Sequence, residues 1–176
     1  MNASYRYYPV TSAQRNWGLY VTCVGHTTTP PGAVFPSPEH PDEYYFTWNV
    51  GRTLHEWQFI LLEKGQGVVE FKNNRSKVNA GSLIVLSPGS WHRYRPDPKT
   101  GWTTYWIGFG GELADRLIGN AGFSKDGEIR SFRNDSSILQ LFAATITDLM
   151  SNAERTPFSA AASVPMLVAT LLEAPK

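Results

Sequence analysis

The stretch SPGSWHRYR, residues 87–95, holds the side chains best suited to specific chemistry. A proline–glycine turn comes first, and polar and aromatic residues then alternate. Alternate residues of a strand share a face, so His92 and Tyr94 point to one side while Arg93 and Arg95 point to the other. We expect the arginines to face solvent and His92 and Tyr94 to point inward. There the histidine could contact an organic ligand, bind a metal ion, or only hydrogen-bond the backbone.

Other candidates for a ligand pocket lie on or beside the inward faces of the neighbouring predicted strands. A sugar pocket combines a flat aromatic wall with a few converging donors and acceptors. Arginine supplies donors in a fixed geometry, histidine donates or accepts, and tryptophan supplies the wall. For each single residue the alternative is an ordinary core or surface position. The selected residues are Arg52, His92, Tyr94, Trp102 and Trp106, with Trp48, Glu63 and Tyr105 behind them.

Length and composition restrict the classes of protein. The 176 residues suffice for one domain with its own core. A single cysteine, Cys23, and the lack of a secretory signal pattern favour a cytoplasmic protein. The aliphatic runs are far shorter than the roughly 20 residues that cross a bilayer, so we expect no membrane contact. The net charge is +1, which argues against DNA binding by this chain alone.

The part of the chain from Leu19 to Phe109 has short β-rich runs separated by turn residues, typical of a sandwich or barrel. Two glycines at residues 64–67 predict a hairpin. Prolines between Thr27 and Pro41 predict a loop or arm that could cover the barrel mouth. Strands are expected near residues 19–24, 44–50, 57–63, 67–73, 76–78, 82–86, 91–95 and 102–109.

The chain after Phe109 has a helical pattern. Residues 112–119 are predicted to form a short helix. A stripe at helical spacing predicts a helix over 136–151, formed by Ile138, Leu141, Phe142, Thr145, Ile146 and Leu149. Thr156 and Pro157 predict the start of a helix towards Leu172, which is either kinked at Pro165 or restarted with Ser163 as its cap. We expect a mainly β barrel over residues 1–130, followed by C-terminal α-helices over 131–176.

The segment from Gly81 to His92 resembles the second conserved motif of cupins, with a glycine, an apolar strand, a proline–glycine turn and a histidine. Metal-binding cupins also supply a His-x-His pair and a glutamate from an earlier strand. The resemblance implies His55, Glu63 and His92 as ligands of a metal-dependent isomerase or dioxygenase. The second histidine of that pair is replaced by Trp57, and zinc or iron needs about three protein ligands. We keep this enzyme as the alternative.

Several separate stretches resemble the N-terminal ligand-binding and dimerisation domain of AraC-type transcription regulators. The likeness spans roughly residues 15–150. It implies a cupin-like β-barrel, also called a double-stranded β-helix or jelly roll, followed by helices. The matching pieces are residues 51–54 (GRTL), 62–67 (LEKGQG), 81–89 (GSLIVLSPG) with His92 and Tyr94, and 102–109 (WTTYWIGF).

This resemblance implies a regulatory module that is not an enzyme and needs no cofactor or metal. Members that sense sugars use residues whose positions match Arg52, His92, Tyr94 and Trp102, and an N-terminal arm closes over the ligand. The helix over 136–151 would form a homodimer, with packing on its own barrel as the alternative. DNA would be bound only by a helix-turn-helix domain that this chain lacks. A lectin-like module without a regulatory role is a further possibility.

Overall fold

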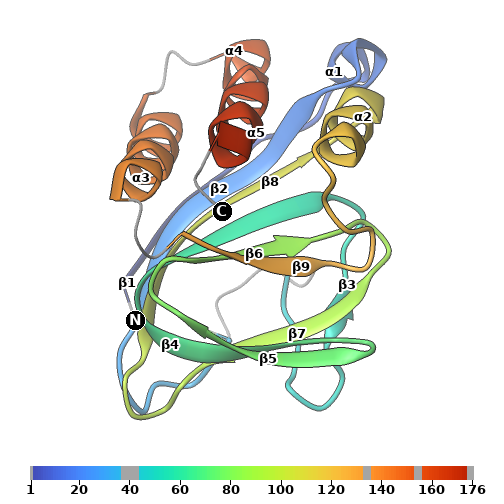
Figure 1. The fold of residues 1–176 in the computed structure, drawn as a ribbon. Helices are drawn as coiled ribbons and strands as arrows, with labels where there is room; N and C mark the ends of the chain where they lie inside the picture. The colour runs from blue at the N-terminus through green and yellow to red at the C-terminus, as the bar shows by residue number, and fades with distance from the viewer. Residues whose placement is uncertain (1, 37–43, 133–135, 153–155, 174–176) are drawn as a thin grey trace.

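The computed structural model describes residues 2–36, 44–132, 136–152 and 156–173. Figure 1 shows a β-barrel with helices gathered on one side of it. This confirms the mainly β fold with C-terminal helices. Among the described residues, none of the helices has the length and apolar character needed to cross a membrane. The strands are β1 (Asn2–Tyr7), β2 (Tyr20–Thr29), β3 (Arg52–Thr53), β4 (Trp57–Phe71), β5 (Asn74–Asn79), β6 (Ser82–Leu86), β7 (Trp91–Pro96), β8 (Trp102–Gly110) and β9 (Glu128–Ser131).

The barrel has two walls that share β4, and all the strand pairs are antiparallel. One wall has the strand order β1-β2-β8-β4-β6-β9, and we call it the helix-covered sheet. The other wall contains β5, β4, β7 and β3, and we call it the open sheet. The first part of β4 pairs with β6 and β8, and its last part pairs with β5 and β7.

The hairpin predicted at residues 64–67 is wrong, because β4 runs without a turn from Trp57 to Phe71. The two glycines instead allow β8 to approach β4 closely. A Cβ on Gly65 would lie 2.1 Å from the carbonyl oxygen of Gly101, and one on Gly67 would lie 2.5 Å from the Trp102 ring. The real hairpin joins β4 to β5.

Several other elements before α3 differ from the prediction. The strand expected at 44–50 is absent, because residues 47–50 form turns. The short strand β3 follows instead, and its two residues, Arg52 and Thr53, pair with β7. Strand β2 continues to Thr29, three residues into the expected loop. Strands β1 and β9 and the helix α1 (Ser12–Trp17) were not predicted. Helix α1 does have a sequence signal, since Thr11 and Gln14 form a capping box.

The helices cover the outer face of the helix-covered sheet. They are α2 (Glu112–Asn120), α3 (Ser136–Ser151), α4 (Pro157–Ala161) and α5 (Ser163–Glu173). The predicted α3 is confirmed, and its apolar stripe packs on its own barrel, where Phe142 is 1% exposed. Thr156 caps α4, and a new helix starts at Ser163, so the chain restarts a helix rather than kinking at Pro165. Ser163 is the first residue of α5 and not its cap. In Figure 1, α3, α4 and α5 lie over β2 and β8.

Candidate functional site

Strand pairing brings two of the selected residues together on one face. Arg52 of β3 lies directly opposite His92 of β7, and directly opposed residues of an antiparallel pair share a face. On the other side of β7, His92 is opposite Phe71 and Tyr94 is opposite Val69. This face points into the barrel, where His92 is 0% exposed.

The Arg52 guanidinium is the centre of a polar cluster. Its Nε donates to Nε2 of His92 at 3.1 Å. One terminal nitrogen donates to the Tyr94 hydroxyl at 2.7 Å and to Oε1 of Gln58 at 3.3 Å. The other terminal nitrogen donates to the backbone carbonyl of Tyr44. All three nitrogens of this charged, partly buried group therefore donate hydrogen bonds within the chain.

His92 is held as a neutral imidazole. Nδ1 lies 3.0 Å from the carbonyl oxygen of Ser90 and donates to it, which leaves Nε2 as the acceptor for Arg52. Burial and the positive charge of Arg52 lower the pKa of His92 to about 3. Burial also raises the pKa of Tyr94, so its phenol stays protonated. The cluster thus presents one fixed positive charge and neutral hydrogen-bonding groups.

Aromatic rings surround the cluster. The centroids of the Tyr94 and Trp102 rings are 6.0 Å apart. Phe35 approaches both, with centroid distances of 5.8 Å to Tyr94 and 5.6 Å to Trp102. The Arg52 guanidinium lies 5.0 Å from the centroid of Phe46. The polar groups therefore lie beside flat apolar walls, as ligand pockets commonly have.

Trp106 lies on the same inward face of β8 as Trp102, because the two are four residues apart along the strand. Its ring covers the backbone of β2, where a Cβ on Gly25 would lie 2.3 Å from the ring. Glycine at this position therefore allows the indole to lie flat against the neighbouring strand.

The structure places two selected residues, Trp48 and Glu63, away from this cluster. The Trp48 ring contacts two guanidiniums, with its centroid 4.5 Å from that of Arg93 and 4.0 Å from that of Arg95. These arginines face outward, so Trp48 lies on the outer face of the open sheet. The side chain of Glu63 is 38% exposed and lies 3.9 Å from that of His26.

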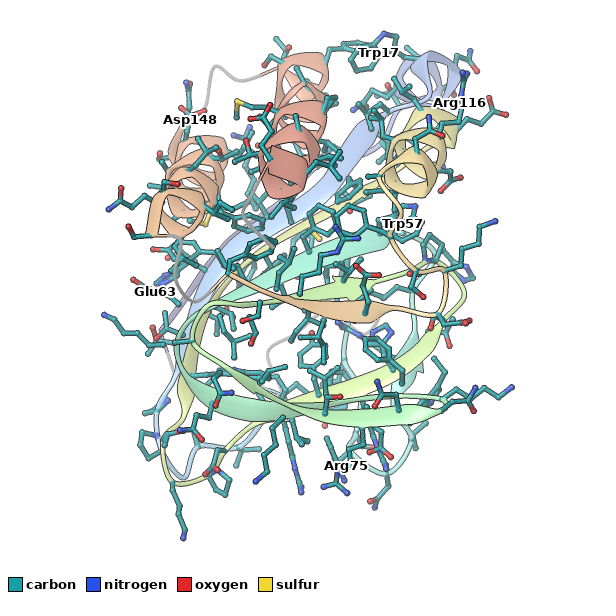
Figure 2. All side chains as sticks on the ribbon, viewed as in Figure 1. Trp17, Trp57, Glu63, Arg75, Arg116 and Asp148 are labelled. Atoms are coloured by element: carbon teal, nitrogen blue, oxygen red, sulfur yellow. The ribbon has the colours of Figure 1, made fainter. Side chains whose placement is uncertain are left out.

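Strand alternation explains the position of Glu63, because the neighbouring Leu62 points inward. Figure 2 labels Glu63 at the outer edge of the barrel. Tyr105, which we expected behind the pocket, is also on this outer side. Its ring centroid lies 4.4 Å from that of His26.

The ligand set of the metal-enzyme alternative does not assemble. His92 is inside the barrel, Glu63 points outward, and His55 is exposed. Both ring nitrogens of His92 are already in hydrogen bonds. Among the described residues, no group of three or more His, Cys, Asp or Glu side chains could hold a metal ion. The arrangement does not favour this alternative.

A pocket of about 570 Å³ was missed by the sequence analysis. Glu56 is a lining residue that is 9% exposed, and one of its carboxylate oxygens accepts from the Tyr44 hydroxyl at 3.2 Å. Alternation could have found it, because Glu56 and Gln58 continue the inward series that includes Ile60. The other lining residues are Tyr7, Tyr8, Pro9, Val10, Arg15, Tyr20, Thr22, Tyr44, Leu54 and His55.

Polar side chains connect this pocket with the Arg52 cluster. The Cys23 thiol donates to Glu56 at 3.6 Å, and Nε2 of Gln58 donates to the Cys23 sulfur at 3.9 Å. Gln58 in turn accepts from Arg52. Burial and the nearby Glu56 carboxylate raise the pKa of Cys23 to about 12, so the thiol remains protonated. Buried polar side chains thus link this partly open pocket to the Arg52 cluster.

The chain matches the AraC-like ligand binding domain family over residues 31–168. This match covers most of the chain, so the chain belongs to this family of ligand-binding domains of transcription regulators. The fold is the cupin-like β-barrel with C-terminal helices that the sequence predicts.

Three individual proteins are similar to parts or most of this chain. The chain is 31% identical over 72 residues to the MmsAB operon regulatory protein of Pseudomonas aeruginosa, a match covering 39% of this chain and 24% of that protein. The AraC-like transcriptional activator CuxR is similar in structure over 98% of this chain and 60% of its own, with a TM-score of 0.53 and 13% identity. A cupin 2 barrel protein of Salinispora arenicola has a TM-score of 0.39 and 18% identity, over 67% of this chain and 82% of its own. The chain thus spans less than two thirds of the two regulators.

Proposed function

We propose that this domain senses a small sugar or a related polyol and passes its presence to the rest of a transcription regulator. The observation that carries the proposal is the position of Arg52, His92 and Tyr94 on one inward face beside Trp102. Sugar hydroxyls need several donors and acceptors in fixed positions, and the sugar C–H groups pack on aromatic faces. The pocket lined by Glu56 adds a volume within the usual range of ligand sites, roughly 300–1,000 Å³.

The charges of the interior favour a neutral, hydroxyl-rich ligand. Arg52 supplies a positive charge, and Glu56 brings a carboxylate to the connected pocket. A ligand with a strong net charge would meet one favourable and one unfavourable partner. Hydroxyl groups can accept from the guanidinium and donate to the carboxylate, so a polyol suits both.

Regulation requires that the ligand favour one of two arrangements, since equal affinity for both would shift nothing. Phe35 is a candidate for the element that moves, because it follows β2 and its ring contacts both Tyr94 and Trp102. This supports the expected arm as a lid over the ligand. The remainder of that arm, residues 37–41 with His40, lies outside the described residues.

The remaining parts of the proposal concern the complete regulator. It would work in the cytoplasm as a homodimer, without catalysis or a cofactor, and a further domain would bind DNA. The α3 stripe is already buried on its own barrel, so dimer contacts would need other apolar side chains of the helical layer. Exposed examples are Phe158, Met166 and Leu172.

A thermal-shift screen with pentoses, hexoses and disaccharides tests the sugar proposal. A matching sugar at about a hundred times its Kd stabilises by about 2.7 kcal/mol, which raises the Tm by roughly 5–10 °C. Arg52→Ala and Trp102→Ala should lose this shift. Tyr94→Phe removes only the hydroxyl beside Arg52 and should reduce the shift. Tyr105→Phe removes the same atom on the outer face of β8 and should keep it.

Two outcomes would contradict the proposal. If no sugar in the panel moves the Tm of the unmodified chain, the ligand belongs to another chemical class. If Tyr94→Phe and Tyr105→Phe respond equally to a sugar that does bind, that sugar does not occupy the Arg52 cluster. Elemental analysis after dialysis tests the enzyme alternative, which requires stoichiometric metal.

A further inference from the structure

The outer face of the open sheet carries a group of cations that ligand binding does not use. Arg75 and Lys77 lie on β5, and Arg93 and Arg95 lie on β7. We call these four residues the basic face. Between the two strands, β4 contributes one acidic residue to this surface, Glu70. Figure 2 labels Arg75 on the side of the barrel opposite the helices.

Strand register arranges the basic face as a grid. Val68 of β4 is opposite Lys77 on one side and Arg95 on the other, and Glu70 is likewise opposite Arg75 and Arg93. Residues two apart on one strand are separated by about 7 Å, and strands on either side of a third are about 10 Å apart. The four cations are therefore held at fixed spacings by the backbone of three paired strands.

Three of the four cations are exposed to a partner, and one of them, Arg75, also lies opposite Glu70 and helps to lower the pKa of that carboxyl. Arg93 is occupied, because its Nε donates to Glu70 at 2.8 Å and a terminal nitrogen donates to the carbonyl of Trp48 at 2.6 Å. Arg75, Lys77 and Arg95 are exposed and line a recess of about 200 Å³. Arg95 is also supported by its stacking on the Trp48 ring at 4.0 Å. Asp97 is an acidic residue at the rim of this recess.

We propose that the basic face binds the phosphodiester backbone of duplex DNA. The chain belongs to a family of ligand-binding domains of transcription regulators, which work next to DNA. DNA is a dense polyanion. Guanidinium groups bind phosphate oxygens through paired hydrogen bonds. DNA carries one negative charge per about 1.7 Å of helix axis. A fixed grid of cations can therefore contact phosphates at many positions along the duplex. An acidic protein would need its carboxylates placed to match this grid.

The contact is weak and independent of sequence. The three exposed cations lie on strands, and the described helices are on the other wall, so this face presents no helix to read bases in the major groove. Three phosphate contacts give a slope of about −2.7 for log K against log salt concentration. Raising the salt from about 20 to about 100 mM then weakens binding roughly 80-fold. The net charge of +1 gives no sign of this basic face, because it sums the charges of the whole chain.

Fluorescence anisotropy of a labelled duplex, titrated with this 176-residue chain at several salt concentrations, tests the proposal. The double variant Arg75→Ala with Lys77→Ala should reduce the steepness of the salt slope by about 1.8. Arg116→Ala with Lys125→Ala removes two exposed cations elsewhere and should keep the original slope. Thermal melts of both variants verify that they fold. Two duplexes of unrelated sequence should bind equally.

Three results would overturn the proposal. The first is no binding of the unmodified chain at about 20 mM salt, where three phosphate contacts have their largest effect. The second is an equal loss of slope in both double variants, which indicates general charge attraction. The third is that polyglutamate displaces the labelled duplex at the same concentration of negative charge as unlabelled DNA does. That result would indicate an acidic protein as the partner.

Discussion

Two interiors of this molecule can be compared. Between the helices and the helix-covered sheet, the core consists almost entirely of apolar side chains, among them Phe59, Phe109, Phe142 and Ile146. Inside the barrel, apolar residues share the space with an arginine, a histidine, a glutamine, a glutamate and a thiol.

The difference indicates that the two interiors have different roles, one in stability and the other in the proposed ligand binding. Burying a polar group costs free energy unless hydrogen bonds replace those made to water. The barrel interior meets this condition through the bonds of Arg52, so its polar residues add little net stability. Under the proposed function, these polar residues serve ligand binding rather than stability. The apolar core under the helices then supplies most of the free energy of folding.

The largest expected effect is on the apolar core. Phe142→Ala removes a side chain that is 1% exposed and leaves a cavity between α3 and the sheet. The expected loss is about 3–5 kcal/mol in the free energy of unfolding, measured by urea denaturation. Leu172→Ala, at an exposed position of α5, is the control and should cost far less. A loss below about 1 kcal/mol for Phe142→Ala would contradict the view that the core under the helices supplies most of the stability.

An intermediate effect is expected from the polar cluster as the pH is lowered. His92 has a pKa of about 3 in the folded chain, and an unfolded histidine titrates near 6.5. Between these values the unfolded chain binds a proton that the folded chain excludes, so stability falls as the pH falls. The limiting slope from this residue is about 1.4 kcal/mol per pH unit, and it disappears above about pH 6.5.

Denaturation between pH 7 and pH 4 measures this effect in the unmodified chain and in His92→Gln. The glutamine removes the titrating group, so the stability difference between the two proteins should shrink as the pH decreases. His55→Gln is the matched control, because His55 is exposed, and it should keep the slope of the unmodified chain. A His92→Gln slope equal to that of the unmodified chain would show that His92 takes up its proton while folded.

The smallest effect is expected outside both interiors, on the open sheet. Glu70 accepts from Arg93 at 2.8 Å, and this pair lowers the pKa of the Glu70 carboxyl. The side chains are 21% and 20% exposed, so water and salt screen the attraction. Glu70→Gln should cost less than about 1 kcal/mol at neutral pH, and less again in about 1 M salt. A loss that does not depend on salt would indicate that the pair acts as part of a core.

Periodicity in the sequence predicted the features that depend on a single strand or helix. The alternation around His92 and Tyr94 and the helical stripe of α3 follow from the geometry of single elements. The same alternation, applied to β4, would also have placed Glu63 outward and Glu56 inward.

Contacts between distant segments were not predictable in this way. Gly65 and Gly67 have the composition of a turn, but they serve the close approach of β8, which no local pattern encodes. Trp48 was expected to lie near the pocket, whereas arginines from β7 hold it on the outer surface. Both differences come from partners about 30 to 50 residues away along the chain.

One covalent segment, β4, belongs to both walls of the barrel. The walls therefore cannot slide past each other as separate plates, and any flexing of the barrel must bend this shared strand. The two positions that lack a side chain, Gly65 and Gly67, lie where its pairing changes from one wall to the other. We therefore expect any bending of the barrel to concentrate at that point.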